Sequence, residues 1–316
     1  MNNLLFCLNA TVPVFLIMVV GYMLRRMKMI DDRFVKQLNT FNFKVTLPIL
    51  LIVDMSSADF YEVMDIKFVL FCFFVTLGSI LCITMLSMLF LKEKSILGEF
   101  IQASYRGSAG VLGMAFIQNI YGNAAVTPLM ILATVPLYNV MAVIILSFTS
   151  PDNQEKNKIR KIKQSMLEIV QNPMIIGIAI GMILSFSRVP IPSIMDKTLR
   201  NLGALATPLA LIGLGAGFEG KKAMTQFAPA FFSGMIKLII LPAIFLPCAI
   251  LLGFMDEKLV AILIMLGAPT AVNTYIMAKN TYHEGVLSSS CVVFSTFFSS
   301  VTITLWLFIL KNRGLV

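Results

Sequence analysis

Residues 258–280 read KLVAILIMLGAPTAVNTYIMAKN, an apolar run with an interruption at its centre. Gly267 and Pro269 stand two residues apart there, and both residue types weaken a continuous helix. An earlier apolar run, residues 97–120, is interrupted in a similar way by Gly107, Gly110 and Gly113. The sequence therefore predicts two broken helices in corresponding parts of the chain.

The composition predicts a membrane protein. Of the 316 residues, 58% are hydrophobic and 13% are charged, and the mean hydropathy is +0.88. Soluble domains carry about 25% charged residues, so too little polar surface remains to cover a soluble core. The net charge is +9, and the Lys and Arg residues lie mainly in short gaps between apolar runs. This distribution argues against a basic stripe that binds nucleic acid. The five cysteines lie in or beside apolar runs without paired metal-ligand spacing, so we expect no metal and no cofactor.

Ten apolar runs approach the roughly 20 residues that a membrane-spanning helix needs. The longest polar stretch, residues 150–168, contains five Lys or Arg residues and separates two sets of five runs. Because positive residues concentrate on the cytoplasmic side, we expect a cytoplasmic linker, with both termini on the outer side of the cell (inner) membrane. The predicted spans cover residues 4–24, 36–56, 67–91, 97–120, 124–149, 169–187, 197–218, 226–253, 258–280 and 284–310.

The two halves of the chain, residues 1–149 and 169–316, share a pattern of glycine and proline. At an offset of 160 residues, Pro13 matches Pro173, Gly21 matches Gly181, Pro48 matches Pro208 and Gly107 matches Gly267. An odd number of spans in each unit requires the second copy to be inverted. The predicted fold is thus an all-α polytopic membrane protein with two inverted five-helix repeats, a design typical of secondary transporters.

The paired interruptions predict a binding site for an anion. Broken backbone at membrane depth must be buried in protein or line a watered cavity, and the N-termini of half-helices attract negative charge. The alternative is that these glycines only allow close helix packing, as small residues often do in membranes.

Several short segments resemble the auxin efflux carrier family, the bacterial relatives of plant PIN transporters, along nearly the whole chain. They are Leu47-Pro48, Gly107 to Gly113, Pro136-Leu137-Tyr138-Asn139, Lys237-Leu238 with Leu241-Pro242, and Ala268-Pro269 through Ala278-Lys279. Plant relatives carry Pro-Asn where this chain has Gly107-Ser108, so the fourth-span break depends here on glycine.

The resemblance implies an NhaA-like fold in which broken helices 4 and 9 cross at the substrate site. Spans 1, 2, 6 and 7 are expected to form a scaffold domain with a homodimer surface, and spans 3–5 and 8–10 a transport domain. Bacterial relatives are usually described as carriers of malate, malonate or similar organic anions, so the resemblance implies a substrate of this kind.

The candidate site residues are polar or small residues near the two breaks. Instead of binding substrate, the polar residues could form hydrogen bonds between helices, and Tyr275 could serve only in packing. Among the intramembrane cations, Arg106 and Lys237 are functional candidates, whereas Lys44 lies near a span end and is expected to reach the interface. The expected substrate-binding residues are Ser108, Gly110, Asn139, Pro269, Thr270 and Asn273, the crossover backbone is Gly107, Gly113 and Gly267, and the supporting residues are Arg106, Lys237, Asn42, Gln118, Asn119 and Tyr275.

All sixteen acidic residues lie in gaps or near span ends, with Asp54 in the acidic second gap. His283, the single histidine, is expected in a solvated loop. These features favour a uniporter-like secondary transporter for a small organic anion, moving by an elevator mechanism in the lipid bilayer, with no enzymatic activity. The alternatives are a sodium- or proton-coupled carrier of the bile-acid-symporter type and an anion channel.

Overall fold

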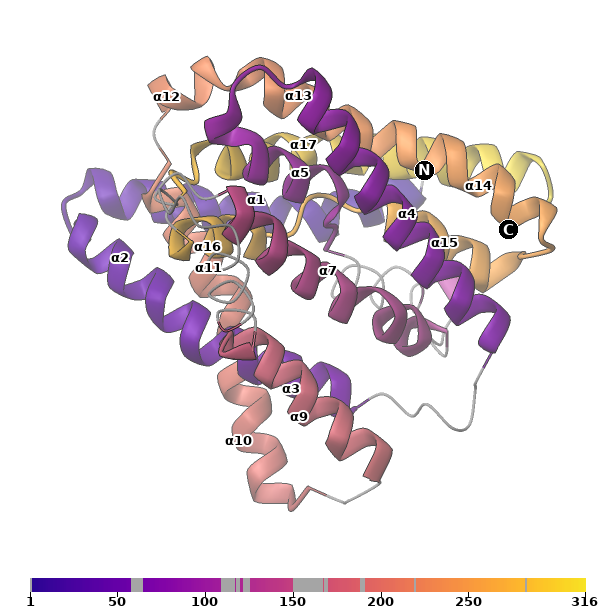
Figure 1. Cartoon of the computed structure of the whole chain (residues 1–316), viewed down its shortest axis with the longest axis horizontal. Helices are drawn as coiled ribbons and strands as arrows, with labels where there is room; N and C mark the ends of the chain where they lie inside the picture. Colours follow the sequence, from indigo (N-terminus) through magenta and orange to yellow (C-terminus); the bar gives the residue numbers. More distant parts are fainter. Residues whose placement is uncertain are drawn as a thin grey trace.

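The structure, a computed structural model, describes residues 2–57, 65–108, 117, 120–121, 126–149, 167, 170–187, 191–218, 220–281 and 283–316. Within these ranges the regular elements are all helical (Figure 1). They are α1 (Asn2–Arg26), α2 (Asp32–Phe41), η1 (Asn42–Thr46), α3 (Leu47–Ser56), α4 (Ile66–Phe90), η2 (Lys94–Ile96), α5 (Leu97–Tyr105), α7 (Thr127–Thr149), α9 (Pro173–Ser187), α10 (Ser193–Ala204), α11 (Ala206–Ala216), α12 (Gly220–Thr225), α13 (Phe227–Met235), η3 (Ile236–Ile240), α14 (Leu241–Leu251), α15 (Asp256–Gly267), α16 (Asn273–Asn280) and α17 (Val286–Asn312).

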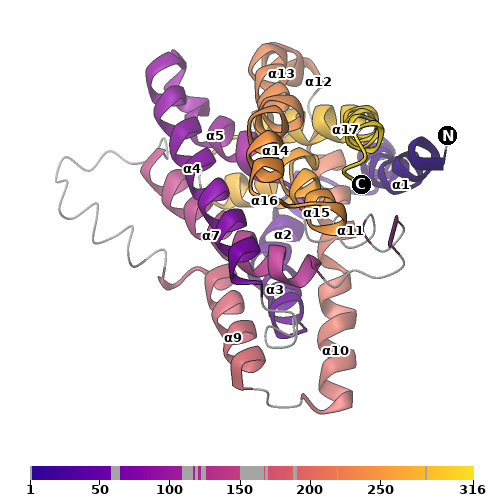
Figure 2. The same ribbon diagram turned by 90° about the vertical axis from the view of Figure 1, so that its right-hand side faces the viewer.

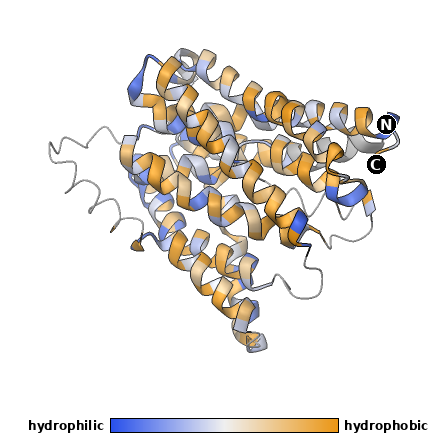
Figure 3. Ribbon diagram, turned by 45° about the vertical axis from the view of Figure 1, so that its right-hand side comes forward, coloured by the Kyte–Doolittle hydropathy of each residue, from blue (hydrophilic) through white to orange (hydrophobic). Residues whose placement is uncertain are grey.

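Six helical stretches in the described part of the chain are long and apolar enough to cross a membrane. Large apolar side chains on their surfaces are widely exposed, including Phe90 at 77% and Leu251 at 87%, and apolar colour covers the outer helices (Figure 3). Such an apolar exterior suits lipid rather than water. The six stretches are Asp32–Ser56, Ile66–Phe90, Thr127–Thr149, Ser193–Ala216, Phe227–Leu251 and Val286–Asn312.

Four predicted spans are not among these six. The first corresponds to α1, a helix of 25 residues that contains Pro13. The other three have different forms. The ninth is divided into α15, with 12 residues, and α16, with 8 residues, and neither piece alone has the length of a span. The sixth contains α9, a shorter apolar helix of 15 residues. In the fourth, α5 ends at Tyr105, and residues 109–116 lie outside the described ranges. Most of the predicted linker, residues 150–168, also lies outside them.

The helices form two neighbouring groups. In one, α3 packs against α9 and α10, and these three extend below the other helices (Figures 1 and 2). In the other, α4 packs against α5 and α7, α14 against α15, and α13 against α17. Helix α1 contacts both α11 and α17, two elements that lie far from it in sequence.

Two π-helical turns stand directly before Leu-Pro pairs. The turn η1 precedes Pro48, and η3 precedes Pro242. Proline has no N–H group, so Pro242 leaves the carbonyl four residues earlier, that of Leu238, without its helical donor. The Nε1 of Trp306, from α17, donates to this carbonyl at 3.1 Å. The single tryptophan thus replaces the hydrogen bond that proline removes and ties α17 to η3.

Glu99 in α5 supplies the N-terminal cap of α17. Its carboxylate accepts hydrogen bonds from the backbone N–H groups of Gly285, at 2.9 Å, and Ser288, at 2.8 Å. Gly285 has a φ of +72°, a left-handed conformation that glycine adopts without strain. The negative charge also lies at the positive end of the helix dipole. This carboxylate is 2% exposed, and a structural partner accounts for its burial.

The prediction of a solvated His283 is wrong, since this residue is 4% exposed. Its Nδ1 lies 3.0 Å from the Thr281 carbonyl oxygen, and its Nε2 lies 3.3 Å from Oγ1 of Thr149 at the end of α7. Gly98 allows the close approach of α5, because a Cβ there would lie 3.0 Å from Nε2. The short loop is covered by two helices that only the tertiary structure brings together.

Acidification is expected to destabilise the protein through His283. Burial lowers the pKa of this residue below its ordinary value of 6.5, although the Glu99 carboxylate acts in the opposite direction. The unfolded chain therefore binds more protons than the folded protein near that pH, and stability falls as the pH drops below about 6.5. We expect His283→Gln to reduce the loss of Tm between about pH 7.5 and pH 5.5, measured by thermal unfolding in detergent. An equal loss in both proteins would contradict this role.

Candidate functional site

The two interrupted runs meet at a short stretch of paired backbone. Gly107, just after α5, forms an antiparallel bridge with Thr270, which lies between α15 and α16. The Ser108 N–H donates to the Pro269 carbonyl at 2.9 Å, and the Ala271 N–H donates to the Arg106 carbonyl at 3.1 Å. Extended backbone that has left its helix thereby finds hydrogen-bond partners in the other interrupted run, as membrane depth requires.

Lys237 satisfies the carbonyl groups at the ends of both helices. Pro269 has no N–H, so the Met265 carbonyl four residues earlier loses its helical donor. The Nζ of Lys237 donates to this carbonyl and to that of Tyr105, the last residue of α5, at 3.0 Å each. The side chain is fully buried. Its positive charge also meets the negative ends of two helix dipoles, so one cation holds both helix termini together.

The small size of Gly107 makes this arrangement possible. A Cβ at this position would lie 2.8 Å from Nζ of Lys237 and 3.4 Å from the carbonyl oxygen of Ala268. Because Nζ is fixed by two hydrogen bonds, it has little freedom to withdraw. We infer that glycine is needed here for the close approach of side chain and backbone.

Arg106 is held beside this pairing by neutral groups. It is 3% exposed. Its Nη2 donates to Oδ1 of Asn139 at 2.6 Å, and its Nη1 donates to Oε1 of Gln102 at 3.2 Å and contacts the sulfur of Met277. Within the described ranges no carboxylate forms an ion pair with this guanidinium. Its charge is therefore oriented but remains available to a negative partner.

A small cavity of about 80 Å³ opens beside the paired segments, between α3, α7, α11 and the start of α16. That volume holds a few water molecules and is well below the roughly 300 Å³ at which pockets for larger ligands begin. Apolar walls come from Leu50, Leu51 and Val135. Its polar or charged lining includes Asp54, Arg106, Ser108, Asn139, Thr207 and Asn273.

The structure places five of the predicted site residues together at this cavity. They are Arg106, Gly107, Ser108, Asn139 and Asn273. Asn273 is the first residue of α16, whose N-terminus has no side-chain cap. The positive end of this helix and the Arg106 guanidinium therefore lie at the same cavity.

Other predicted residues support the surrounding structure. Oγ1 of Thr270 donates to the Ala103 carbonyl, and its N–H donates to Oγ of Ser295, both at 2.9 Å. Nδ2 of Asn42 donates to the Ala206 carbonyl at 2.9 Å, which joins η1 to α11. Tyr275 is 1% exposed.

Of the remaining predicted residues, two lie in the described ranges near the interruption and four lie outside those ranges. Gly267 faces Pro242, whose ring lies 3.2 Å from the position of a Cβ at that glycine, and Pro269 contributes its carbonyl to the backbone pairing. The residues outside the described ranges are Gly110, Gly113, Gln118 and Asn119.

Asp54 lines the cavity, although sequence reasoning assigned it to the acidic gap after the second span. Helix α3 continues to Ser56, so this carboxylate belongs to the helix rather than to the following loop. A signal was present, because Leu50, Leu51 and Asp54 are spaced three and four residues apart and share one helix face. Arg200 of α10 is near enough to attract its charge.

Interrupted helices that enclose a small polar cavity inside an apolar, multi-helix protein define a polytopic membrane protein of the transporter class. The chain matches the membrane transport protein family over residues 6–307 and belongs to this family, the auxin efflux carriers. A protein of Methanocaldococcus jannaschii named as an uncharacterized transporter is 23% identical over 313 residues, which cover 96% of this chain and 99% of that relative.

Removal of the Lys237 ammonium group is expected to destabilise the site. Lys237→Met removes the donor that the buried Tyr105 and Met265 carbonyls share, and an unsatisfied buried carbonyl costs about 1–3 kcal/mol. The Met265 carbonyl keeps a longer hydrogen bond from the Tyr138 hydroxyl, at 3.4 Å. We expect Tm, measured by thermal unfolding of the purified protein, to fall by at least about 2 °C. Lys44→Met is the matched control, because Lys44 is also on a π-helical turn but is exposed. Equal Tm values for both variants would show that the double hydrogen bond contributes little.

Proposed function

We propose that the protein is a secondary transporter that moves a small organic anion, such as a mono- or dicarboxylate, across the cell membrane. The observation that carries this proposal is the convergence of the buried Arg106 guanidinium and the uncapped N-terminus of α16 on one polar cavity. Both attract negative charge. The side chains of Asn139 and Asn273, which line the same cavity, add hydrogen-bonding capacity without further fixed charge.

The charges near the backbone pairing also favour an anion. Lys237 and Arg106 are cationic, whereas Asp54 is the one acidic residue in the described cavity lining. The amide of Asn139 orients Arg106 without neutralising it. A carboxylate substrate would supply the missing negative partner in a site where water is scarce, and charge-assisted hydrogen bonds are strongest in such surroundings.

The proposed mechanism is an elevator-like movement of one group of helices past the other. The scaffold would contain α1, α2–α3, α9 and α10–α11, and the transport domain α4, α5, α7, α13–α14, α15–α16 and α17. The contacts of α3 with α9 and α10, and those of α4 with α5 and α7, support this division. Because the cavity measures about 80 Å³, it must widen to admit a dicarboxylate, as an alternating-access cycle would allow.

Further parts of the proposal follow from the sequence pattern. The two halves would be inverted five-helix repeats in an NhaA-like fold, with helices 4 and 9 crossing at the substrate. The scaffold would form the surface of a homodimer, and both termini would lie on the outer side of the cell (inner) membrane. The interruption between α15 and α16 and its backbone pairing with Gly107 support the crossing.

The anion site is tested by ligand-dependent thermal shifts. We expect at least one compound in a panel of mono- and dicarboxylates and indole acids to raise the Tm of the purified wild-type protein. Asn273→Ala should abolish this shift, because it removes an amide at the cavity, whereas Asn42→Ala should retain it, because Asn42 joins η1 to α11. If the ligand-dependent rise in Tm persists in both Asn273→Ala and Ser108→Ala, the ligand binds elsewhere.

Asp54 favours a second candidate, a proton-coupled carrier, over uniport. The groups that face this carboxylate are Arg106 across the cavity and Arg200 on α10, while α9 contributes no titratable side chain. An ionised Asp54 offsets the charge of Arg106 and repels an anion. A protonated Asp54 leaves the cavity with a net positive charge, so protonation and anion binding would favour each other.

Transport at different pH values separates the two candidates. For proton coupling, we expect uptake into proteoliposomes of a substrate that stays ionised to show a falling KM as the external pH is lowered. Asp54→Asn should remove this dependence, because the amide is neutral throughout. Uptake that follows the membrane potential and is insensitive to pH in both proteins would favour uniport and exclude this role for Asp54.

A further inference from the structure

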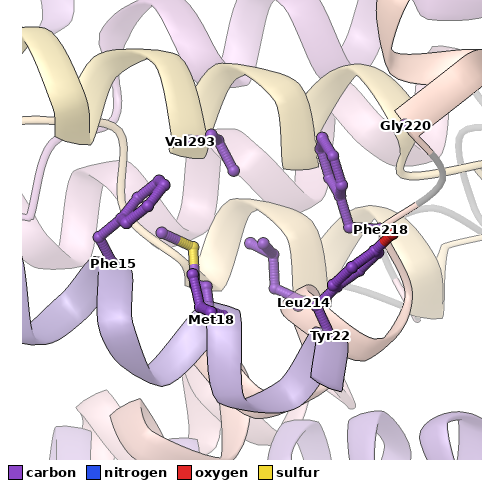
Figure 4. A pocket seen from close by; sticks show the side chains of 9 residues that line it. Phe15, Met18, Tyr22, Leu214, Phe218, Gly220 and Val293 are labelled. Carbon is purple, nitrogen blue, oxygen red and sulfur yellow. The ribbon is translucent and has the colours of Figure 1, made fainter. Parts of the chain in front are cut away.

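An apolar groove lies on the outside of the protein where α1, α11 and α17 meet (Figure 4). Its volume is about 240 Å³. Phe15, Met18 and Tyr22 of α1 and Val293 of α17 face one another across it, with Leu214 at its base. The lining is almost entirely apolar, and the groove shares no residue with the polar cavity described above.

The packing of α1 against α11 creates this groove. A Cβ at Gly215 would lie 1.9 Å from the carbonyl oxygen of Met18, and one at Gly21 would lie 2.3 Å from that of Ile212. The two helices therefore touch through their backbones. The aromatic side chains of α1 stand beside this contact and face α17, which leaves an apolar recess between the three helices.

A basic hollow of about 380 Å³ continues from one end of the groove, and Tyr22 and Phe218 line both. Arg25 and Arg26, the last residues of α1, line the hollow together with Asp32. Arg25 forms an ion pair with Asp32. Arg26 is exposed, so two cations and one carboxylate leave one positive charge at this end of the apolar groove.

We propose that the groove and the hollow together bind one anionic phospholipid. The phosphate would contact Arg26, with Arg25 beside it, and an acyl chain would lie along Phe15, Met18 and Val293. Basic pockets between membrane helices attract anionic headgroups, and each nearby cation contributes about a fivefold gain in affinity. Tyr22 lies at the boundary of the two hollows, where an amphipathic ring suits the junction of chain and headgroup.

A lipid bound at this site would also connect the two groups of helices. Helix α17 caps its N-terminus with Glu99 and contacts η3 through Trp306, so it belongs to the group that contains the backbone pairing. Helix α1 packs on α11, which contacts α2 and α10 and would belong to the proposed scaffold. A lipid in this groove would contact both groups at once. This inference rests on the groove itself and stands independently of the transported substrate.

The test compares lipids and matched variants in detergent-purified, delipidated protein. We expect dioleoylphosphatidylglycerol to raise the wild-type Tm more than dioleoylphosphatidylcholine does, and glycerol 3-phosphate to have no effect. Arg26→Ala should weaken the apparent affinity for the anionic lipid about fivefold. Arg33→Ala should not, because Arg33 is exposed and lies outside both hollows.

A second pair of variants tests the acyl-chain groove. Val293→Trp fills the groove and should reduce the response to both lipids, whereas Val301→Trp, at an exposed position on the same helix, should keep it. After phosphatidylglycerol is added back, native mass spectrometry should detect one bound lipid in the wild type and less in Arg26→Ala. Equal responses of the wild type to the two lipids, or an unchanged affinity in Arg26→Ala, would overturn the proposal.

Discussion

The arrangement of the site depends on one ammonium group. Lys237 donates to the carbonyls of Tyr105 and Met265, two acceptors that their own helices leave without a donor. A buried charge is costly in a membrane unless it is paired or hydrogen-bonded, and here the negative ends of two helices provide that compensation. The same contact stabilises both interruptions, so neither helix can be restored or displaced without affecting the other.

Arg106 extends this arrangement toward the cavity. Its neighbours Gln102 and Asn139 fix its direction through neutral amide oxygens. A carboxylate in their place would have neutralised the guanidinium and removed its attraction for an anion. The polar groups at this site therefore divide into those that hold backbone, such as Lys237 and Thr270, and those that face the cavity, such as Asn273.

The sequence predicted the helical class, the membrane setting and the interruption in residues 258–280, because these depend on local composition and on proline chemistry. It also directed attention to Lys237 but could not identify its acceptors, which lie 132 and 28 residues away. His283 was assigned to a solvated loop because local hydropathy does not show that distant helices cover it. Asp54 was assigned to a polar gap although its spacing from Leu50 and Leu51 already indicated a shared helix face.

The division between structural and cavity-facing groups has a consequence for specificity. Ser108, Asn139 and Asn273 line the cavity, whereas the backbone pairing of Gly107 with Thr270 involves main-chain atoms and the fixed Nζ of Lys237. Cavity side chains can change without loss of the donors that hold the interrupted helices, because those donors come from elsewhere. A substitution at Gly107 has no such freedom, since any Cβ there meets the lysine. The backbone structure of the site is thus constrained by the need to hydrogen-bond the main-chain groups of the interrupted helices. The choice of bound anion depends instead on a few polar side chains that can be replaced.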